Sequence, residues 1–314
     1  MTYHILHITT RGTFLSVDRG HLVCKYPDDT EKRMALSDIR AIIAGIQGIS
    51  FSNECIARLI ENDAIILHCN NQYKPVGWTM PFDRVIRQEA FLNQLKQNKD
   101  FNHKLWKNIL QYKFENQSYI LNYMEIENSI SELSKRPLPS EANIAKHFWN
   151  KYFKGLGSEI LREHKNAENF ENKALNYGYA VVQSLLYRSI LIHGLLPNLG
   201  IHHKARYNST PLVYDLLEPL RGFVELFLYK FFEKNQEEYE EQDFKNWIKY
   251  LAESLRHCRL QNKQQTHKFM DAIDVYVNSI VRAFINLNNE ELWIPSLENH
   301  YWCLDNNSNR ENEE

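Results

Sequence analysis

Short apolar runs separated by turn residues fill the first 80 positions of the chain. Arg19-Gly20 and Pro27-Asp28-Asp29 are typical turn sequences between such runs. The pattern predicts short strands, with one helix among them from Ser52 to Glu61 that Ser52 or Asn53 can cap. A loop is expected from Asn70 through Gly77. The predicted strands cover residues 5–8, 14–17, 22–25, 34–36, 38–43 and 65–69.

From Pro81 onward glycine becomes rare and apolar residues recur with the period of a helix. Ser140 can cap a helix, Gly194 can end one, and Thr210 before Pro211 is a good helix start. We therefore expect an α+β fold class: a β-rich domain over residues 1–80, a larger all-α domain over 81–300, and a disordered acidic tail over 301–314. The predicted helices cover residues 82–98, 103–132, 140–154, 172–193, 210–232, 242–259 and 268–287.

Composition and cysteine spacing place the chain among ordinary globular proteins. Of its 314 residues, 43% are hydrophobic and 24% are charged, which is a usual balance for a soluble protein. The N-terminus lacks the basic start and apolar run of a signal peptide, and no stretch is apolar for long enough to span a bilayer. The five cysteines form no CxxC pair, which favours reduced thiols in a cytoplasm over disulfides or a zinc ribbon.

The net charge of -2 hides an uneven distribution of charged residues. Between Lys146 and Arg206 there are nine basic and four acidic residues, a surplus of five, whereas acidic residues gather at 237–241 and in the tail. A basic middle is typical of a protein that contacts phosphates, and a solvated helix face explains the charge equally well.

Two acidic residues and one histidine stand where a loop meets a predicted helix. Glu141 directly follows the cap Ser140, His203 ends the sequence Gly200-Ile201-His202-His203, and Glu218 precedes Pro219. Two carboxylates and one imidazole suit Mg²⁺ or Mn²⁺, with coordination positions left for water and a phosphate. The basic and aromatic residues nearby favour chemistry on a nucleic-acid phosphodiester.

Ordinary structural roles explain the same residues when each is taken alone. An acid in the first turn, such as Glu141, commonly stabilises its helix, and a loop histidine is often a structural group. Asp215 and Glu218 are three residues apart and share a helix face, where two acids repel unless a cation lies between them. Nucleotide-binding glycine loops and the HExxH and GxSxG motifs are absent from the sequence.

In their order along the chain, these segments resemble the CRISPR-associated spacer-acquisition integrase family. Glu141-Ala142-Asn143-Ile144-Ala145 is similar to its first metal-ligand motif, and Ala174 to Tyr179 is similar to its central helix. Gly200 to His203 resembles its G-x-x-H motif, and Leu212 to Arg221 resembles its acidic helix. The resemblance covers nearly the whole chain. Glu168 to Asn172 departs from the Asp-Pro that the family often has there.

The resemblance implies a metal-dependent DNA endonuclease and integrase of antiviral defence. Glu141, His203 and Glu218 would hold the metal, and motif spacing favours His203 over His202. The metal would assist a DNA 3′ hydroxyl as it attacks a phosphodiester of the CRISPR array, while Asp215 would support the ligand geometry or reach the metal through water. In this interpretation Glu141, His203, Glu218 and Asp215 form the catalytic set.

The resemblance also implies partners. We expect a homodimer joined through the β domains, double-stranded DNA as spacer precursor and CRISPR repeat, and a small ferredoxin-like partner nuclease, in a prokaryotic cytoplasm. The compact length and the segment Pro75-Val76-Gly77 resemble members from type II systems, whose effector and accessory proteins are further expected partners. The residues expected to contact DNA are Lys146, Arg162, Arg188, Lys204, Arg206 and Arg221.

A second interpretation comes from a different functional class. The chain would be a noncatalytic DNA-binding scaffold of an adaptation complex, with a purely structural triad. Metal-dependent strand transfer separates the two interpretations, because a scaffold would bind DNA normally without binding metal or joining DNA ends.

Overall fold

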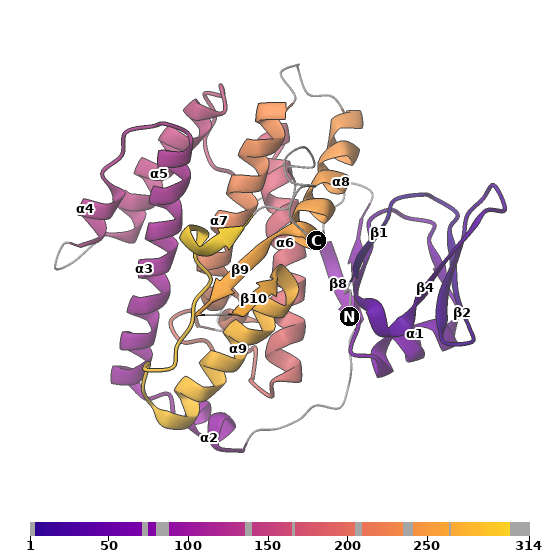
Figure 1. The fold of residues 1–314 in the computed structure, drawn as a ribbon, viewed down its shortest axis with the longest axis horizontal. Coiled ribbons are helices and arrows are strands. Elements are labelled where there is room, and N and C mark those ends of the chain that lie inside the picture. Colours follow the sequence, from indigo (N-terminus) through magenta and orange to yellow (C-terminus); the bar gives the residue numbers. More distant parts are fainter. Residues whose placement is uncertain are drawn as a thin grey trace, which may run out of the picture.

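The computed structural model describes residues 4–70, 75–79, 88–135, 140–164, 167–204, 209–234, 241–263 and 265–301. A β-rich N-terminal part lies beside a larger, mostly helical part, so the mixed fold predicted from the sequence is present at this coarse level (Figure 1). The predicted tail lies outside the described residues, apart from Tyr301.

Two four-stranded sheets form the N-terminal part. One has the strand order β1-β5-β7-β8, in which β1, β5 and β7 are parallel and β8 runs antiparallel at the edge. The other has the order β4-β3-β2-β6. Ser52 caps the short helix as predicted, since its side chain accepts a hydrogen bond from the Cys55 N–H. The elements are β1 (His4–Ile8), β2 (Phe14–Asp18), β3 (His21–Lys25), β4 (Glu31–Ala35), η1 (Leu36–Asp38), β5 (Ile39–Ala44), β6 (Ser50–Phe51), α1 (Asn53–Glu61), β7 (Ile65–Cys69) and β8 (Pro75–Thr79).

The loop predicted from Asn70 through Gly77 is wrong at its end, because Pro75–Thr79 form strand β8. An edge strand tolerates proline and glycine because one of its sides needs no ladder partner. The indole ring of Trp78 stacks on Tyr187 of the helical part, with ring centroids 4.9 Å apart. This long-range contact holds the segment in a strand despite its turn-like composition.

The first sheet belongs to two hydrophobic cores at once. On one face, Ile42 and Ile66 pack in a small core with the second sheet. On the other face, Ala41, Ile43 and Leu67 join the large core of the helical part. Alternate residues of a strand point to opposite faces, so β5 and β7 serve both cores. The sheet thereby fixes the N-terminal part against the helices.

The helical part is built around two long buried helices, α6 and α7. They cross closely at Gly178, where an added Cβ would lie 2.3 Å from Cγ1 of Val224. Pro211 starts α7 as predicted, and Gly194, with φ of 79°, follows the end of α6. The helices are α2 (Gln88–Lys96), α3 (Lys99–Tyr123), α4 (Ile130–Ser134), α5 (Glu141–Gly155), α6 (Phe170–Ile192), α7 (Pro211–Lys234), α8 (Glu241–His257) and α9 (Phe269–Asn286), with the 3-10 helix η2 (Leu297–Asn299).

Two predictions for this part are wrong in detail. The helix predicted over 103–132 is divided into α3 and α4, because Glu125 takes a left-handed backbone with φ of 57° just after α3 ends. The part predicted as all-α also contains a three-stranded antiparallel sheet made of β9 (Arg259–Asn262), β10 (Gln265–Lys268) and β11 (His300–Tyr301). The strands β9 and β10 are mostly polar, so the sequence pattern did not predict this sheet. Leu260 of β9 is fully buried.

Candidate active site

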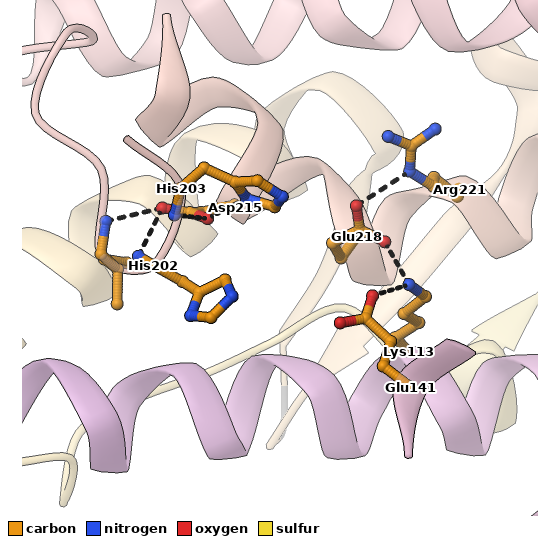
Figure 2. A network of polar contacts seen from close by, with 8 residues as sticks. Lys113, Glu141, His202, His203, Asp215, Glu218 and Arg221 are labelled. Carbon is orange, nitrogen blue, oxygen red and sulfur yellow. Dashed lines mark hydrogen bonds and ion pairs between the residues drawn. The ribbon is translucent and has the colours of Figure 1, made fainter. Parts of the chain in front are cut away.

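The predicted site residues come from the start of α5, the body of α7 and the loop between α6 and α7. Glu141 is the first residue of α5, where the Ser140 hydroxyl accepts a hydrogen bond from the Asn143 N–H at 3.4 Å. Glu218 is buried on α7, and His203 lies on the loop. Folding thus brings the three predicted residues to one region of the helical part (Figure 2).

Asp215 organises the loop that carries His203. This carboxylate is fully buried and accepts the backbone N–H groups of Ile201, His202 and His203 at 2.6, 2.9 and 3.1 Å. Its Oδ1 atom also lies 2.6 Å from Nδ1 of His203, and this hydrogen bond raises the pKa of the imidazole. The bond occupies Nδ1, so Nε2 is the ring nitrogen left to bind a metal.

The loop needs a glycine at position 200, three residues before His203. A Cβ added there would lie 2.4 Å from the carbonyl oxygen of His203 and 2.8 Å from Oδ2 of Asp215. Any side chain would therefore push the loop away from the carboxylate that holds it.

Trp106 of α3 supports both histidines. Its ring stacks on His202 with centroids 4.5 Å apart and an interplanar angle of 3°, and meets His203 edge-on at 5.7 Å. His202 is therefore engaged by the indole, whereas His203 is engaged by Asp215. Nothing in the sequence around Trp106 indicates this role.

Lys113, also on α3, joins the two candidate carboxylates. Its Nζ atom lies 2.7 Å from Oε1 of Glu141 and 2.7 Å from Oε2 of Glu218 (Figure 2). The Lys113 and Glu218 side chains are only 11% and 9% exposed, whereas that of Glu141 is 41% exposed. The ammonium therefore sits at the inner end of a site that opens on the Glu141 side.

The charges of this cluster set its pKa values. Burial acts to raise the pKa of Glu218, but Arg221 and Lys113 outweigh it and hold the pKa at about 2. Burial acts to lower the pKa of Lys113, and Glu218 with Glu141 outweighs it and raises the pKa. Both groups are thus kept ionised by each other. Asp215 and Glu218 share a helix face but have different partners, because Asp215 pairs with His203 and Glu218 pairs with Lys113 and Arg221, so these two acids need no cation between them.

A second layer of polar groups lies behind Glu218. Nε of Arg221 is 3.3 Å from Oε1 of Glu218, and its guanidinium lies over the Tyr179 ring at 4.8 Å. The Tyr179 hydroxyl donates to Oε1 of Glu225 at 2.7 Å, while Oε2 of Glu225 is buried and has no hydrogen-bond partner among the described residues. Burial raises the pKa of Glu225 to about 7. Arg162 lies over the same Tyr179 ring at 5.5 Å.

Residues 6–271 match the family model described as CRISPR associated protein Cas1. The chain belongs to this Cas1 family. The CRISPR-associated endonuclease Cas1 of Neisseria meningitidis serogroup C (strain 8013) is 28% identical over 304 residues, which cover 95% of this chain and 97% of that protein. The family predicted from motif order is confirmed, and with it the functional class of a CRISPR adaptation endonuclease and integrase.

Solved structures with the same fold include a casposase bound to integration product. It has a TM-score of 0.75 and 17% identity, covering 93% of this chain and 92% of that chain. A chain of a Cas6-RT-Cas1–Cas2 complex has a TM-score of 0.71 and 12% identity, covering 93% of this chain and 36% of that chain. At these identities the likeness concerns the fold.

The donor types of the site suit the divalent metal that Cas1 membership implies. Carboxylate oxygens of Glu141 and Glu218 already gather around one cation, and the Asp215–His203 pair is the usual support of a metal-binding imidazole. Within the described ranges, no three His, Cys, Asp or Glu residues are assembled closely enough to hold a metal. The donors therefore fit a metal chemically, and side-chain movement is needed to assemble them.

The residues predicted to contact DNA lie in different environments. Lys146 on α5 and Lys204 on the loop between α6 and α7 are exposed. Arg162 and Arg221 are partly buried against Tyr179, next to the site. Arg206 lies outside the described residues.

Arg188 has a structural environment that argues against its predicted DNA contact. Its Nε atom donates to the carbonyl oxygen of Asp63 in the N-terminal part at 2.7 Å, and NH1 pairs with Asp274 of α9 at 3.3 Å. The side chain is 8% exposed. Arg188 therefore joins the two parts of the molecule and presents little surface to a ligand.

No helix within the described parts of the chain is both long and apolar enough to cross a membrane.

Proposed function

We propose that the chain integrates DNA into a CRISPR array by strand transfer at a metal held by Glu141, Glu218 and Nε2 of His203. One observation carries the proposal: Glu141 and Glu218 come from two different helices, and a carboxylate oxygen of each lies 2.7 Å from the same cation, the ammonium of Lys113. Two carboxylates that share one cation are the expected core of a site for a hard metal ion. Carboxylate and imidazole donors together support Mg²⁺ or Mn²⁺.

Each neighbouring residue has a role in this proposal. Asp215 holds the imidazole in the tautomer with Nδ1 protonated, which leaves Nε2 for the metal. Arg221 fixes one oxygen of Glu218 and leaves the other to face Glu141. When bound, the metal would polarise the scissile phosphodiester and stabilise charge on the attacking and leaving oxygens. The DNA 3′ hydroxyl is the nucleophile, so no side chain needs to form a covalent intermediate.

The DNA track in this proposal runs past exposed Lys146 and Lys204, with Arg162 and Arg221 at the edge of the site. Arg206, outside the described residues, stays in the predicted set. The spacer precursor and the repeat are the expected duplexes.

The proposed assembly is a homodimer joined through the β-rich parts, flanking a small Cas2-like partner in a prokaryotic cytoplasm. The solved complex of Cas6-RT-Cas1 with Cas2 supports that partner by analogy. Sedimentation of the full-length protein with and without a Cas2 partner would test the assembly. A type II origin, with its effector and accessory proteins, stays a prediction from the sequence resemblance, and a map of the neighbouring genes would test it.

One observation favours the scaffold alternative. Lys113 already pairs with both carboxylates, so each has an ionic partner without a metal. A structural ion-pair cluster would look similar, and the chain would then bind DNA without joining it.

A strand-transfer assay on purified, metal-free protein decides between these functions. A short duplex with 3′ hydroxyl ends and a plasmid carrying a CRISPR repeat are incubated with Mg²⁺ or Mn²⁺, and a duplex with 3′-deoxy ends is the control. Joined product that needs both the metal and the 3′ hydroxyl supports the integrase. Normal duplex binding with no joined product under either metal would support the scaffold.

A further inference from the structure

Lys113 occupies the position between Glu141 and Glu218 that a metal bound by both residues would take. Its ammonium contacts one oxygen of each carboxylate at the same distance of 2.7 Å. A divalent ion bound to the same oxygens would stand at about 2.1 Å from each. The two kinds of cation therefore compete for one space.

We propose that Lys113 is an exchangeable counter-ion that keeps the two carboxylates together in the metal-free protein and leaves when a divalent metal binds. This inference rests on the metal site proposed above and adds a specific event to it. Lys113 would be a positioning residue that sets the metal affinity of the site.

Local charge supports exchange over simultaneous occupancy. Asp215, Glu141 and Glu218 carry three negative charges, and Arg221 with Lys113 carries two positive charges, so the metal-free cluster has a net charge of -1 when His203 is neutral. Replacing the ammonium with a divalent ion brings the cluster to neutrality. Keeping both cations would leave a surplus positive charge beside the buried side chains of Lys113 and Glu218, which is costly.

Geometry supplies a route for the exchange. The exposed side of the site is that of Glu141, at 41% side-chain exposure, while Glu218 is held from behind by Arg221. Glu141 is therefore the carboxylate that a metal from solvent would reach first, and Glu218 would follow as a ligand when Lys113 leaves. Lys113 has a long flexible stem, and its displaced ammonium can donate three hydrogen bonds to an incoming phosphate.

Metal binding by full-length variants tests the exchange directly. Mn²⁺ binding is titrated by electron paramagnetic resonance on metal-free protein, without DNA, and thermal unfolding is followed with and without Mn²⁺. For Lys113→Met we expect the Kd for Mn²⁺ to fall by about tenfold or more, because no cation must be displaced. We expect its metal-free Tm to fall, since the two carboxylates lose their shared partner, and Mn²⁺ to raise its Tm more than that of the wild type.

Two further variants make the test independent of net charge and of folding. Lys107→Met removes the same charge from an exposed position of α3, and its Mn²⁺ affinity should match the wild type. Lys113→Arg keeps a cation in a rigid fork suited to carboxylates, so its Mn²⁺ affinity should fall. If Lys113→Met does not fold without metal, a comparison of the Kd for Mn²⁺ between Lys113→Arg and the wild type still decides the inference.

The outcomes separate this inference from the metal site itself. If Lys113→Met binds Mn²⁺ no more tightly than wild type, or Lys113→Arg binds it more tightly, the exchange is overturned. If Glu218→Gln and Glu141→Gln leave wild-type Mn²⁺ binding unchanged, the metal site is wrong, whatever Lys113 does. Loss of binding in those two variants together with tighter binding in Lys113→Met supports both proposals.

Discussion

His203 and Asp215 are joined by two contacts, because Oδ1 of Asp215 accepts the backbone N–H of His203 at 3.1 Å and lies 2.6 Å from its ring Nδ1. One carboxylate thus fixes both the position of the residue and the orientation of its ring. Asp215 is fully buried, so water does not compete with His203 for its carboxylate.

Asp215→Asn should weaken metal binding by about 10- to 100-fold while the chain still folds. The amide oxygen can accept some of the loop N–H groups, but an amide NH₂ in place of one carboxylate oxygen opposes two donors and loses the charge that supports the imidazole. Mn²⁺ titration with a thermal unfolding control would measure this. Wild-type affinity in Asp215→Asn would show that His203 is not the supported ligand.

Glu141→Ala, His203→Ala and Glu218→Ala should each abolish strand transfer, because a site with three protein ligands loses its metal when one is removed. Circular dichroism and sedimentation should show that each variant is folded. The matched control is His202→Ala, which removes the stack on Trp106 at a cost of about 0.5–1.5 kcal/mol in stability and should keep most strand transfer. Inactivity of His202→Ala with activity in His203→Ala would exchange the roles of the two histidines.

Glu225→Gln should change how stability depends on pH. The folded protein holds the Glu225 proton up to about pH 7, whereas the ordinary value is 4.5. Between these values the folded state binds more protons than the unfolded state, so the free energy of unfolding falls as pH rises. The glutamine cannot ionise and can still accept a hydrogen bond from Tyr179. From pH 5 to pH 8 the free energy of unfolding of the variant should therefore rise relative to that of the wild type, by up to about 3 kcal/mol.

Urea unfolding of both proteins at several pH values measures this difference, with the exposed Glu54→Gln as the control. A difference between Glu225→Gln and wild type that is constant with pH would mean that Glu225 does not titrate in this range.

DNA binding should weaken steeply with salt, because contacts between basic residues and phosphates release counter-ions. Replacing Lys204 and Arg206 together by alanine should lower duplex affinity and flatten the salt slope, with Mn²⁺ binding retained. Arg188→Ala is the informative contrast, since its guanidinium bonds to Asp63 and Asp274. It should lower the Tm and leave the salt slope unchanged. A slope reduced only by Arg188→Ala would mean that the buried arginine reaches DNA after all.

Local signals in the sequence predicted the starts of α5 and α7 correctly. Ser140 and Pro211 start their helices as expected, because caps and a first-turn proline act through neighbouring backbone groups alone. Strand β8 and the β9–β10 hairpin were missed, because their conformation depends on partners far away in the chain, such as Tyr187 for Trp78.

In the candidate site too, local sequence signals identify some residues, and contacts between distant parts of the chain decide the others. Glu141 begins α5 and His203 lies on the loop before α7, as their predicted positions at helix edges require, whereas Glu218 lies mid-helix in α7 and its predicted edge position is wrong. The roles of all three stay predictions. Lys113 could not be selected, because it lies mid-helix in α3 and meets Glu141 only when α3 and α5 pack together. Sequence periodicity shows which face of a helix is buried and does not show which buried lysine finds two carboxylates.

Gly200→Ala tests whether the loop geometry, and not only the ligand set, controls the site. The new methyl group would lie 2.4 Å from the carbonyl oxygen of His203 and 2.8 Å from Oδ2 of Asp215, both closer than van der Waals contact. We expect the loop to move off Asp215, so that Mn²⁺ affinity and strand transfer fall together although Glu141, His203 and Glu218 are intact. Gly77→Ala is the control, because no atom of the residues that the structure describes lies within 4 Å of its added Cβ. Gly178→Ala should instead lower the Tm, since its Cβ would lie 2.3 Å from Val224 at the crossing of α6 and α7. Normal metal affinity in Gly200→Ala would show that the site tolerates a displaced loop and would weaken the assignment of His203 as a ligand.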